Sequence, residues 1–209
     1  MPGPTPRMWP TPWQPTKHLL PTTVAIIGAG PLGRWLALAA ARAGFRVLLE
    51  DVMPANLHHA QEFMRQQLGP EALGGESGTD SGFRVNFVST IEEAVRNADL
   101  AIDCVPDELE SKLEIFWLLD RMAPPRTALA TPTTRLSIAD LAACTYRSDR
   151  CVAISAEASS LSSGASGADI LLRTTTKTTA QTIALLDDFW RRLGFSPTFA
   201  PDPAEQLPS

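Results

Sequence analysis

Short apolar runs alternate with stretches of helical composition along most of the chain. Residues 23–27 (TVAII) are apolar and β-branched after the first threonine, as expected of a strand buried on both faces. An Ala- and Leu-rich stretch at 34–43 follows and favours a helix, and 45–50 indicates a second strand. A strand–turn–helix–strand unit of about 30 residues predicts that the two strands pair in parallel.

The same alternation continues toward the C-terminus. It predicts an amphipathic helix over 108–122, with an apolar stripe formed by Leu109, Leu113, Phe116, Trp117 and Leu119. Alternation of this kind is typical of a Rossmann-like, doubly wound α/β domain with a mainly parallel sheet. The remaining strands are expected at 85–88, 100–105, 128–130, 151–154, 169–173 and 197–199, and the remaining helices at 53–68, from 90, 137–144 and 179–193.

Three segments lack this pattern. Residues 1–21 hold seven prolines, so we expect an extended, mobile leader whose Trp9 and Trp13 either dock on the domain or a partner or belong to a disordered tail. Residues 69–82 hold five glycines and 155–167 are mostly small, which predicts loops. The expected organisation is a leader (1–21), one domain (22–200) and a short C-terminal tail (201–209).

Composition narrows the class of protein. Apolar residues make up 44% of the 209 residues and charged residues 20%, as in a single folded domain. The net charge of −5 disfavours a general nucleic-acid binder, and no apolar run approaches the ~20 residues of a membrane span. No secretory signal is evident, so we expect a cytoplasmic protein. Three cysteines are too few and too scattered for a disulfide framework or a zinc site.

A glycine-rich turn follows the first predicted strand. Gly28, Gly30 and Gly33 form a GxGxxG pattern that ends a strand and opens a helix, and Asp51 follows at the end of the next strand. In such a motif the glycines permit a tight turn, close approach of a pyrophosphate and close helix–strand packing. The carboxylate of Asp51 would bind ribose hydroxyls and repel a 2′-phosphate, which favours NAD over NADP. The alternative is a loop without a ligand.

Several segments together resemble the N-terminal NAD-binding domain of the 3-hydroxyacyl-CoA dehydrogenases. The resemblance runs from about residue 23 to 199 and implies a Rossmann-like fold, an NAD cofactor and a link to fatty acid metabolism. The segments that carry it are VAIIGAGPLG (24–33), AGFRVLLED (43–51), ADLAIDCVPD (98–107), LESK (109–112), LDRMAPP (119–125) and ATPTTRLSI (130–138).

The resemblance also implies which residues contact the cofactor. Asp107 takes the place of a family glutamate that follows Val-Pro. Lys112 matches a family lysine near the cofactor, although it could equally be a solvated helix lysine. The implied cofactor contacts are Gly28, Gly30, Pro31, Leu32, Gly33, Asp51, Val105, Pro106 and Lys112.

The catalytic residues of the family do not carry over. The family strand that ends in a general-base histidine ends here in Ser155, and a serine is not a useful base near neutral pH without activation. Ser155, Glu157 and Asp107 are the candidates for a relocated base. The adjacent His58 and His59 are expected at the surface, because neighbouring helical residues point apart and make a poor metal pair.

Two further departures concern packing and assembly. Trp35 stands where the family has a small residue, so its indole must alter the packing beside the cofactor or at an interface. The family's second, helical domain, which supplies dimer contacts and the acyl-CoA cleft, has no counterpart before residue 209. We therefore expect an exposed apolar patch that is covered in a homodimer or in a larger assembly.

Three functions remain open from the sequence. The first is an NAD(H)-binding protein without efficient 3-hydroxyacyl-CoA dehydrogenase activity. The second is an active NAD-dependent oxidoreductase with a relocated base, acting on a hydroxyacyl-CoA or another small hydroxy substrate. The third is an interaction subunit that no longer binds NAD.

Overall fold

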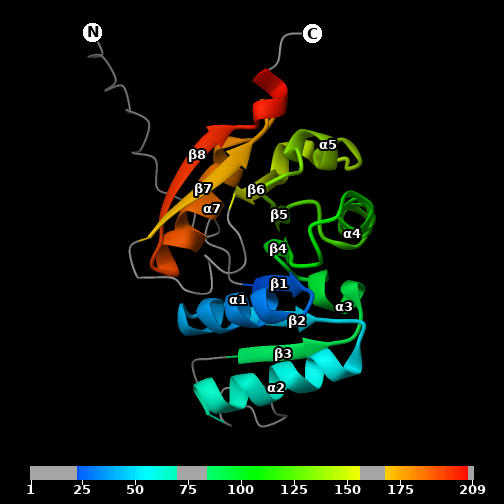
Figure 1. Cartoon of the computed structure of the whole chain (residues 1–209), viewed down its shortest axis with the longest axis vertical. Helices are drawn as coiled ribbons and strands as arrows, with labels where there is room; N and C mark the ends of the chain where they lie inside the picture. The colour runs from blue at the N-terminus through cyan, green and yellow to red at the C-terminus, as the bar shows by residue number, and fades with distance from the viewer. Residues whose placement is uncertain (1–22, 70–83, 156–167, 207–209) are drawn as a thin grey trace, which may run out of the picture.

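The computed structural model describes residues 23–69, 84–155 and 168–206, which form one eight-stranded sheet with helices on both faces (Figure 1). The strand order is β3-β2-β1-β4-β5-β6-β7-β8. Every neighbouring pair is parallel except β6 and β7, which run antiparallel. The first six positions have the doubly wound Rossmann order, so the predicted fold class is confirmed.

The elements begin and end close to the predicted positions. Gly44 and Gly194 follow the helices α1 (Pro31–Arg42) and α7 (Ala180–Arg192) with positive φ, where a residue with a side chain would be strained. The strands are β1 (Thr23–Ile27), β2 (Arg46–Glu50), β3 (Arg84–Val88), β4 (Leu100–Asp103), β5 (Ala128–Pro132), β6 (Cys151–Ser155), β7 (Asp169–Thr174) and β8 (Ser196–Pro201). The helices are α1 (Pro31–Arg42), α2 (Pro54–Leu68), α3 (Ile91–Val95), α4 (Leu109–Met122), α5 (Ile138–Ala143) and α7 (Ala180–Arg192), with 3₁₀ turns η2 (Ser148–Arg150) and η3 (Pro203–Gln206).

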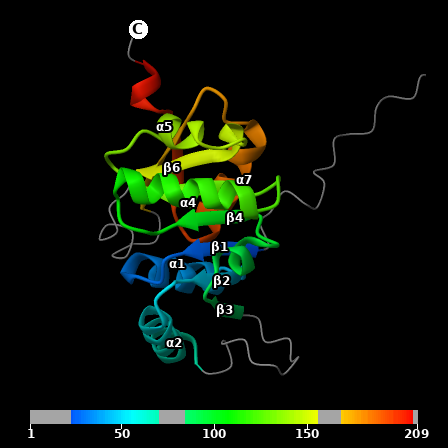
Figure 2. The ribbon, with the colours of Figure 1, turned by 90° about the vertical axis from the view of Figure 1, so that its right-hand side faces the viewer.

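The sheet separates two hydrophobic cores, because successive strand residues point to opposite faces. In β1, Val24 and Ile26 pack on the side of α1, α2 and α7, whereas Ala25 and Ile27 pack on the side of α3, α4 and α5. The two layers of helices are visible in Figures 1 and 2. All five side chains of β1 are buried, as the apolar run predicts.

The expected stripe of α4 is only partly correct. Phe116 and Leu119 are buried, but Leu109 and Trp117 are each 47% exposed. The indole of Trp117 lies 4.3 Å from the guanidinium carbon of Arg121, a cation–π contact at the surface. Helical spacing alone gives an apolar stripe wider than the face that α4 buries.

Several predictions fall outside the described residues. They concern the leader with Trp9 and Trp13, most of the loops at 69–82 and 155–167, and the last three residues of the tail. The domain boundaries therefore stay predictions. Among the described residues, no helix combines the length and the apolar character of a membrane span.

Candidate functional site

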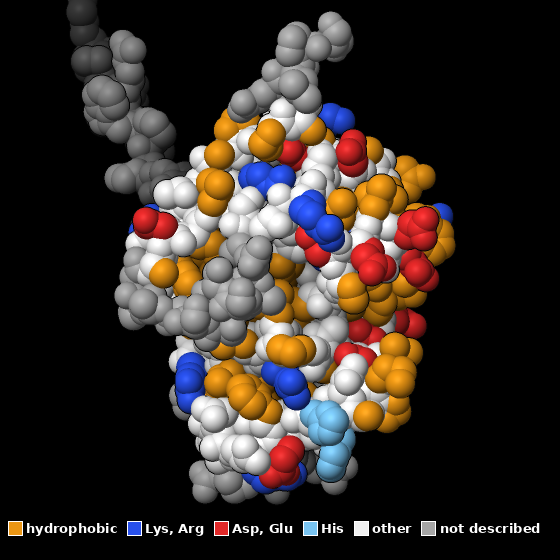
Figure 3. All heavy atoms as spheres, in the orientation of Figure 1, with side chains coloured by type: hydrophobic (Ala, Val, Ile, Leu, Met, Phe, Trp, Pro, Cys, Tyr) orange, Lys and Arg blue, Asp and Glu red, His pale blue; other side chains and the backbone are white. Residues whose placement is uncertain are grey.

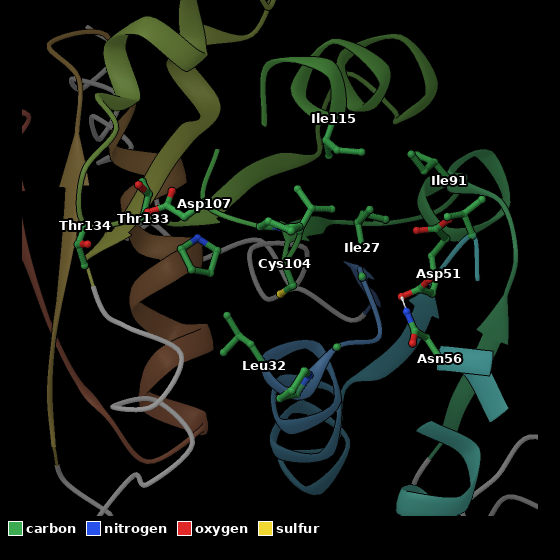
Figure 4. Close-up of a pocket in the computed structure, with 18 residues that line it drawn as sticks. Ile27, Leu32, Asp51, Asn56, Ile91, Cys104, Asp107, Ile115, Thr133 and Thr134 are labelled. Atoms are coloured by element: carbon green, nitrogen blue, oxygen red, sulfur yellow. Dashed lines mark hydrogen bonds between the residues drawn. The ribbon is translucent and has the colours of Figure 1, made fainter. Parts of the chain in front are cut away.

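A cavity of about 800 Å³ opens at the carboxyl ends of β1, β2, β4 and β5 (Figure 4). It lies where the strand order reverses between β1 and β4, which is the usual ligand position in an open α/β sheet. Its lining consists of Ile27, Gly28, Gly30, Pro31, Leu32, Glu50, Asp51, Val52, Asn56, Ile91, Cys104, Val105, Pro106, Asp107, Ile115, Pro132, Thr133 and Thr134.

The three glycines of the first turn have distinct roles. Gly28 has φ +102, and an added Cβ would lie 3.2 Å from the carbonyl of Cys104. At Gly33 an added Cβ would lie 1.8 Å from the carbonyl oxygen of Gly28, so only glycine lets α1 approach the turn. At Gly30 nothing lies within 4 Å of an added Cβ, because this position faces the open cavity.

The N-terminus of α1 faces the cavity. Gly30 is the N-cap and Pro31 the first helical residue, and no side chain caps the helix. The free amides and the helix dipole suit an anion such as a diphosphate. None of the residues lining the cavity is lysine or arginine, so these amides are its main positive feature.

Asp51 ties the glycine turn to the end of β2. Its Oδ2 accepts hydrogen bonds from the Ala29 amide at 2.8 Å and from Asn56 Nδ2 at 3.0 Å, and its Oδ1 accepts one from the Met53 amide at 2.8 Å. A carboxylate offers about four acceptor positions. Oδ1 therefore retains capacity for a ligand hydroxyl, while Oδ2 is committed to the protein.

Glu50, which the sequence reading missed, precedes Asp51 and also lines the cavity. Its side chain is buried, and its backbone oxygen accepts the Gly28 amide at 2.8 Å. Burial, and then the neighbouring Asp51 charge, raises the pKa of Glu50 to about 7. The signal in the sequence that could have identified Glu50 was an acidic residue at the end of a largely apolar strand.

Lys112 lies beneath the cavity and is fully buried. The alternative interpretation of Lys112 as a solvated helix lysine is therefore wrong. Its Nζ donates to Asp103 Oδ2 at 3.1 Å, to Thr131 Oγ1 at 2.9 Å and to the Val105 carbonyl at 3.3 Å. It is not among the lining residues. Burial raises the pKa of Asp103, although the Lys112 charge opposes this shift. Lys112 thus supports the segment after β4 from below.

Val105, Pro106 and Asp107 form the cavity wall after β4. Asp107 Oδ1 is buried and has no hydrogen-bond partner within the described part of the chain. The exposed Arg135 donates from its terminal nitrogen to the Asp107 carbonyl at 2.7 Å, and its Nε lies 3.8 Å from Oδ2. An unpartnered buried acceptor beside a cavity is suited to a ligand hydroxyl or amide.

Ser155 ends β6, as expected, but its hydroxyl is engaged by a residue that the sequence reading did not consider. Arg173 Nε on β7 donates to Ser155 Oγ at 2.6 Å, and a terminal nitrogen of the same guanidinium donates to the Thr133 carbonyl at 2.8 Å. Ser155 is not a lining residue of the cavity. A cationic donor held on the hydroxyl opposes any role as a proton acceptor.

The other predicted residues lie as follows. Trp35 packs edge-to-face on Phe195, with ring centroids 6.0 Å apart, and is not among the residues that line the cavity. His58 and His59 are exposed as predicted and form the pale blue patch in Figure 3. Glu157 lies outside the described residues.

The described residues fit a dinucleotide. They provide an uncapped helix N-terminus, space beside Gly30, carboxylates at Asp51 and Asp107, and apolar walls between them. In Figure 4, Asp51 and Asn56 lie at one end of the cavity, whereas Asp107, Thr133 and Thr134 lie at the other.

Comparison with known proteins gives a consistent result. The family described as "3-hydroxyacyl-CoA dehydrogenase, NAD binding domain" matches residues 23–155. A probable 3-hydroxybutyryl-CoA dehydrogenase of Bacillus subtilis (strain 168) is 35% identical over 133 residues, which are 62% of this chain and 46% of that protein. The chain thus spans less than half the length of this relative.

Solved structures show the same similarity. The crystal structure of a 5-formyl-3-hydroxy-2-methylpyridine 4-carboxylic acid 5-dehydrogenase, an NAD⁺-dependent dismutase, matches with a TM-score of 0.71 and 28% identity, over 87% of this chain and 58% of that one. The 3-hydroxybutyryl-CoA dehydrogenase of Escherichia coli K12 matches with a TM-score of 0.73 and 24% identity, over 88% and 38%. At this identity the second match shows the fold alone.

Proposed function

Because the chain belongs to the family of 3-hydroxyacyl-CoA dehydrogenase NAD-binding domains, whose cofactor is NAD, we propose that it holds NAD(H) in this cavity without efficient dehydrogenase activity. The diphosphate would lie against the amides after Gly30, and Asp51 Oδ1 would accept a ribose hydroxyl. Val105 and Pro106 would flank the dinucleotide, while Lys112 would act from beneath by holding the Val105 carbonyl.

The observation that carries the second half of this proposal is the contact between Ser155 and Arg173. Oxidation of an alcohol by NAD needs a base within hydrogen-bond reach of the hydroxyl. By the family resemblance, Ser155 stands at the position of that base, and its oxygen instead accepts a hydrogen bond from a guanidinium at 2.6 Å. Losing a general base costs about 10²–10⁴-fold in rate.

Titration with NADH, followed by its fluorescence, tests the binding proposal. We expect saturable binding, and Asp51→Ala should weaken it about 10- to 100-fold because a charged acceptor of the ribose is lost. Glu62→Gln, at an exposed carboxylate of α2, is the matched control and should leave the affinity unchanged. Absence of NADH binding at millimolar concentration would refute the proposal.

A second function is favoured by Asp107, whose Oδ1 is buried at the cavity wall without a partner. A carboxylate in this position could accept the proton of a hydroxy substrate, either a hydroxyacyl-CoA or another small molecule. Steady oxidation of NADH by acetoacetyl-CoA at ordinary enzyme rates, abolished in Asp107→Asn, would establish this function and overturn the first. We expect no such turnover.

A further inference from the structure

Glu50 is a buried carboxylate for which the proposed function has no role. The residue as a whole is 5% exposed, and it shares the sheet face of Leu48, which packs toward α3 and α4. No hydrogen bond or ion pair reaches its carboxylate from the described part of the chain. Because Glu50 lines the cavity, a carboxylate without a partner there is available to a ligand that carries a hydrogen-bond donor.

The surroundings of Glu50 fit a flat apolar ring. Ile27, Ile91 and Ile115 line the cavity on this side of the sheet. Figure 4 shows Ile91 and Ile27 toward the end of the cavity that holds Asp51 and Asn56, with Ile115 above them. If Asp51 binds the adenosine ribose, the base attached to that ribose reaches the isoleucines and the carboxylate at the end of β2.

We propose that Glu50 accepts a hydrogen bond from the exocyclic amino group of the adenine base and thereby selects adenine over 6-oxopurine dinucleotides. This inference rests on the proposed binding of NAD(H). An ionised carboxylate only accepts hydrogen bonds. Adenine presents a donor at position 6, whereas hypoxanthine presents a carbonyl oxygen there, and two facing acceptors repel.

The protonation state of Glu50 gives this contact a pH signature. The charged group that acts on it is the adjacent Asp51, whereas Glu92, Glu93 and Glu114 on the facing helices are exposed. The facing residues of β1 and β3 are apolar. With a pKa of about 7, the carboxyl is protonated in mildly acidic solution and can then donate to a carbonyl oxygen. Selectivity for adenine must therefore rise as the pH rises through neutrality.

The test compares dissociation constants of NADH and of reduced nicotinamide hypoxanthine dinucleotide at pH 6 and pH 8.5. We expect at least about a 5-fold preference for NADH at pH 8.5, since the facing acceptors leave a polar group unpaired or repelled. The preference should shrink at pH 6. Equal affinities at both pH values would overturn the inference and leave the binding proposal standing, whereas failure of both dinucleotides to bind would overturn both.

Variants separate Glu50 from a general charge effect. Glu50→Leu should bring the two dissociation constants within about twofold of each other, because the acceptor is lost. Glu50→Gln, which always carries both a donor and an acceptor, should make the ratio independent of pH. Glu92→Gln removes the same charge from the exposed side of α3 and should retain the wild-type ratio and its pH dependence. A wild-type ratio in Glu50→Leu would contradict the assignment.

Discussion

At the scale of single residues, Lys112 places a positive charge where water is excluded. Both its side chain and that of Asp103 are no more than 1% exposed, and three oxygens hold the ammonium. Such a pair contributes little net stability compared with apolar residues, but breaking it leaves an uncompensated buried charge. The pair also fixes the backbone of Val105 at the cavity wall.

Lys112→Met should therefore lower the free energy of unfolding by about 3–5 kcal/mol at pH 7, because Asp103 is left unpaired. The double variant Asp103→Asn/Lys112→Met should recover part of this loss. Urea unfolding of the two variants and the wild type measures both effects. A single variant as stable as the wild type would show that the charge pair has no structural role.

The positions of residues that depend only on their neighbours in the sequence were predictable from the sequence. Asp51, Gly28 and Gly30 line the cavity because strand, turn and helix are consecutive there, whereas Gly33 does not, and their contact with a cofactor stays a prediction. The environments of Lys112 and Trp35 were not predictable, because they depend on distant residues: Thr131 lies 19 positions from Lys112, and Trp35 packs on Phe195 between α7 and β8. Glu50 was missed because burial at a strand end depends on which helices cover it.

At the scale of elements, the junction between β1 and α1 combines two different requirements for glycine. Gly33 is needed for packing, since a side chain would collide with the turn. Gly30 has room for a side chain in this structure. The lack of a side chain there instead leaves space beside the helix N-terminus. We therefore expect stability and ligand affinity to depend on different glycines of one motif.

Substitution by alanine should separate these requirements. Gly30→Ala should unfold at the wild-type denaturant concentration but bind NADH at least about 10-fold more weakly, because its methyl group occupies the ligand's space. Gly33→Ala should lower the unfolding free energy by about 1–3 kcal/mol, because α1 must move away from Gly28. Denaturation curves and NADH titrations check the pair, and equal effects on both properties would refute the separation.

Element positions were predictable where local signals were strong. Ser137 caps α5 and Thr179 caps α7 with side-chain hydrogen bonds, at the residues where the sequence predicts these helices to begin. The exposed side of α4 was not predictable in the same way. Trp117 has the spacing of a core residue, and only the position of the sheet shows that it faces outward.

At the scale of the whole molecule, Asp202 joins the end of the described chain to the middle of the fold. Its Oδ2 accepts hydrogen bonds from Ser137 Oγ at 2.9 Å and from the Ala139 amide at 3.0 Å. Its Oδ1 accepts the Ala204 amide at 3.2 Å and lies 3.9 Å from Arg173. The same Arg173 holds Ser155, so one network connects β6, β7, α5 and the segment after β8.

This network makes stability depend on pH. Burial alone would raise the pKa of Asp202, but hydrogen bonds from the Ala139, Ala204 and Ile138 amides and from Ser137 outweigh it and lower the pKa below 3.8. The carboxylate therefore stabilises the fold fully above pH 3.8, and this contribution is lost as the pH falls through the folded-state pKa.

We expect Asp202→Asn to lower the unfolding free energy by about 1–3 kcal/mol at pH 7, with a smaller difference from wild type near pH 3. Asp169→Asn, at an exposed position on β7, is the control and should have little effect. Urea unfolding at the two pH values gives the comparison, and a difference that grows on acidification would contradict the assigned direction.

The global arrangement was predictable as far as the alternation of elements determines it. Successive crossovers have a fixed hand, so alternation predicts a parallel sheet with its site at the carboxyl ends of the strands. The antiparallel pairing of β6 with β7 was not predictable, because residues 156–167 carry no periodic signal in the sequence. The hydrogen bond between Arg173 and Ser155, which depends on this pairing, was therefore not predicted.

The cavity is assembled from the ends of four strands that are adjacent only once the sheet is complete. A dinucleotide bound there contacts the folded form alone, so it raises the unfolding free energy by mass action. Because cells degrade proteins through their unfolded fraction, the abundance of this protein would follow the supply of its nucleotide. A drop in that supply would shorten its lifetime before any reaction rate changed.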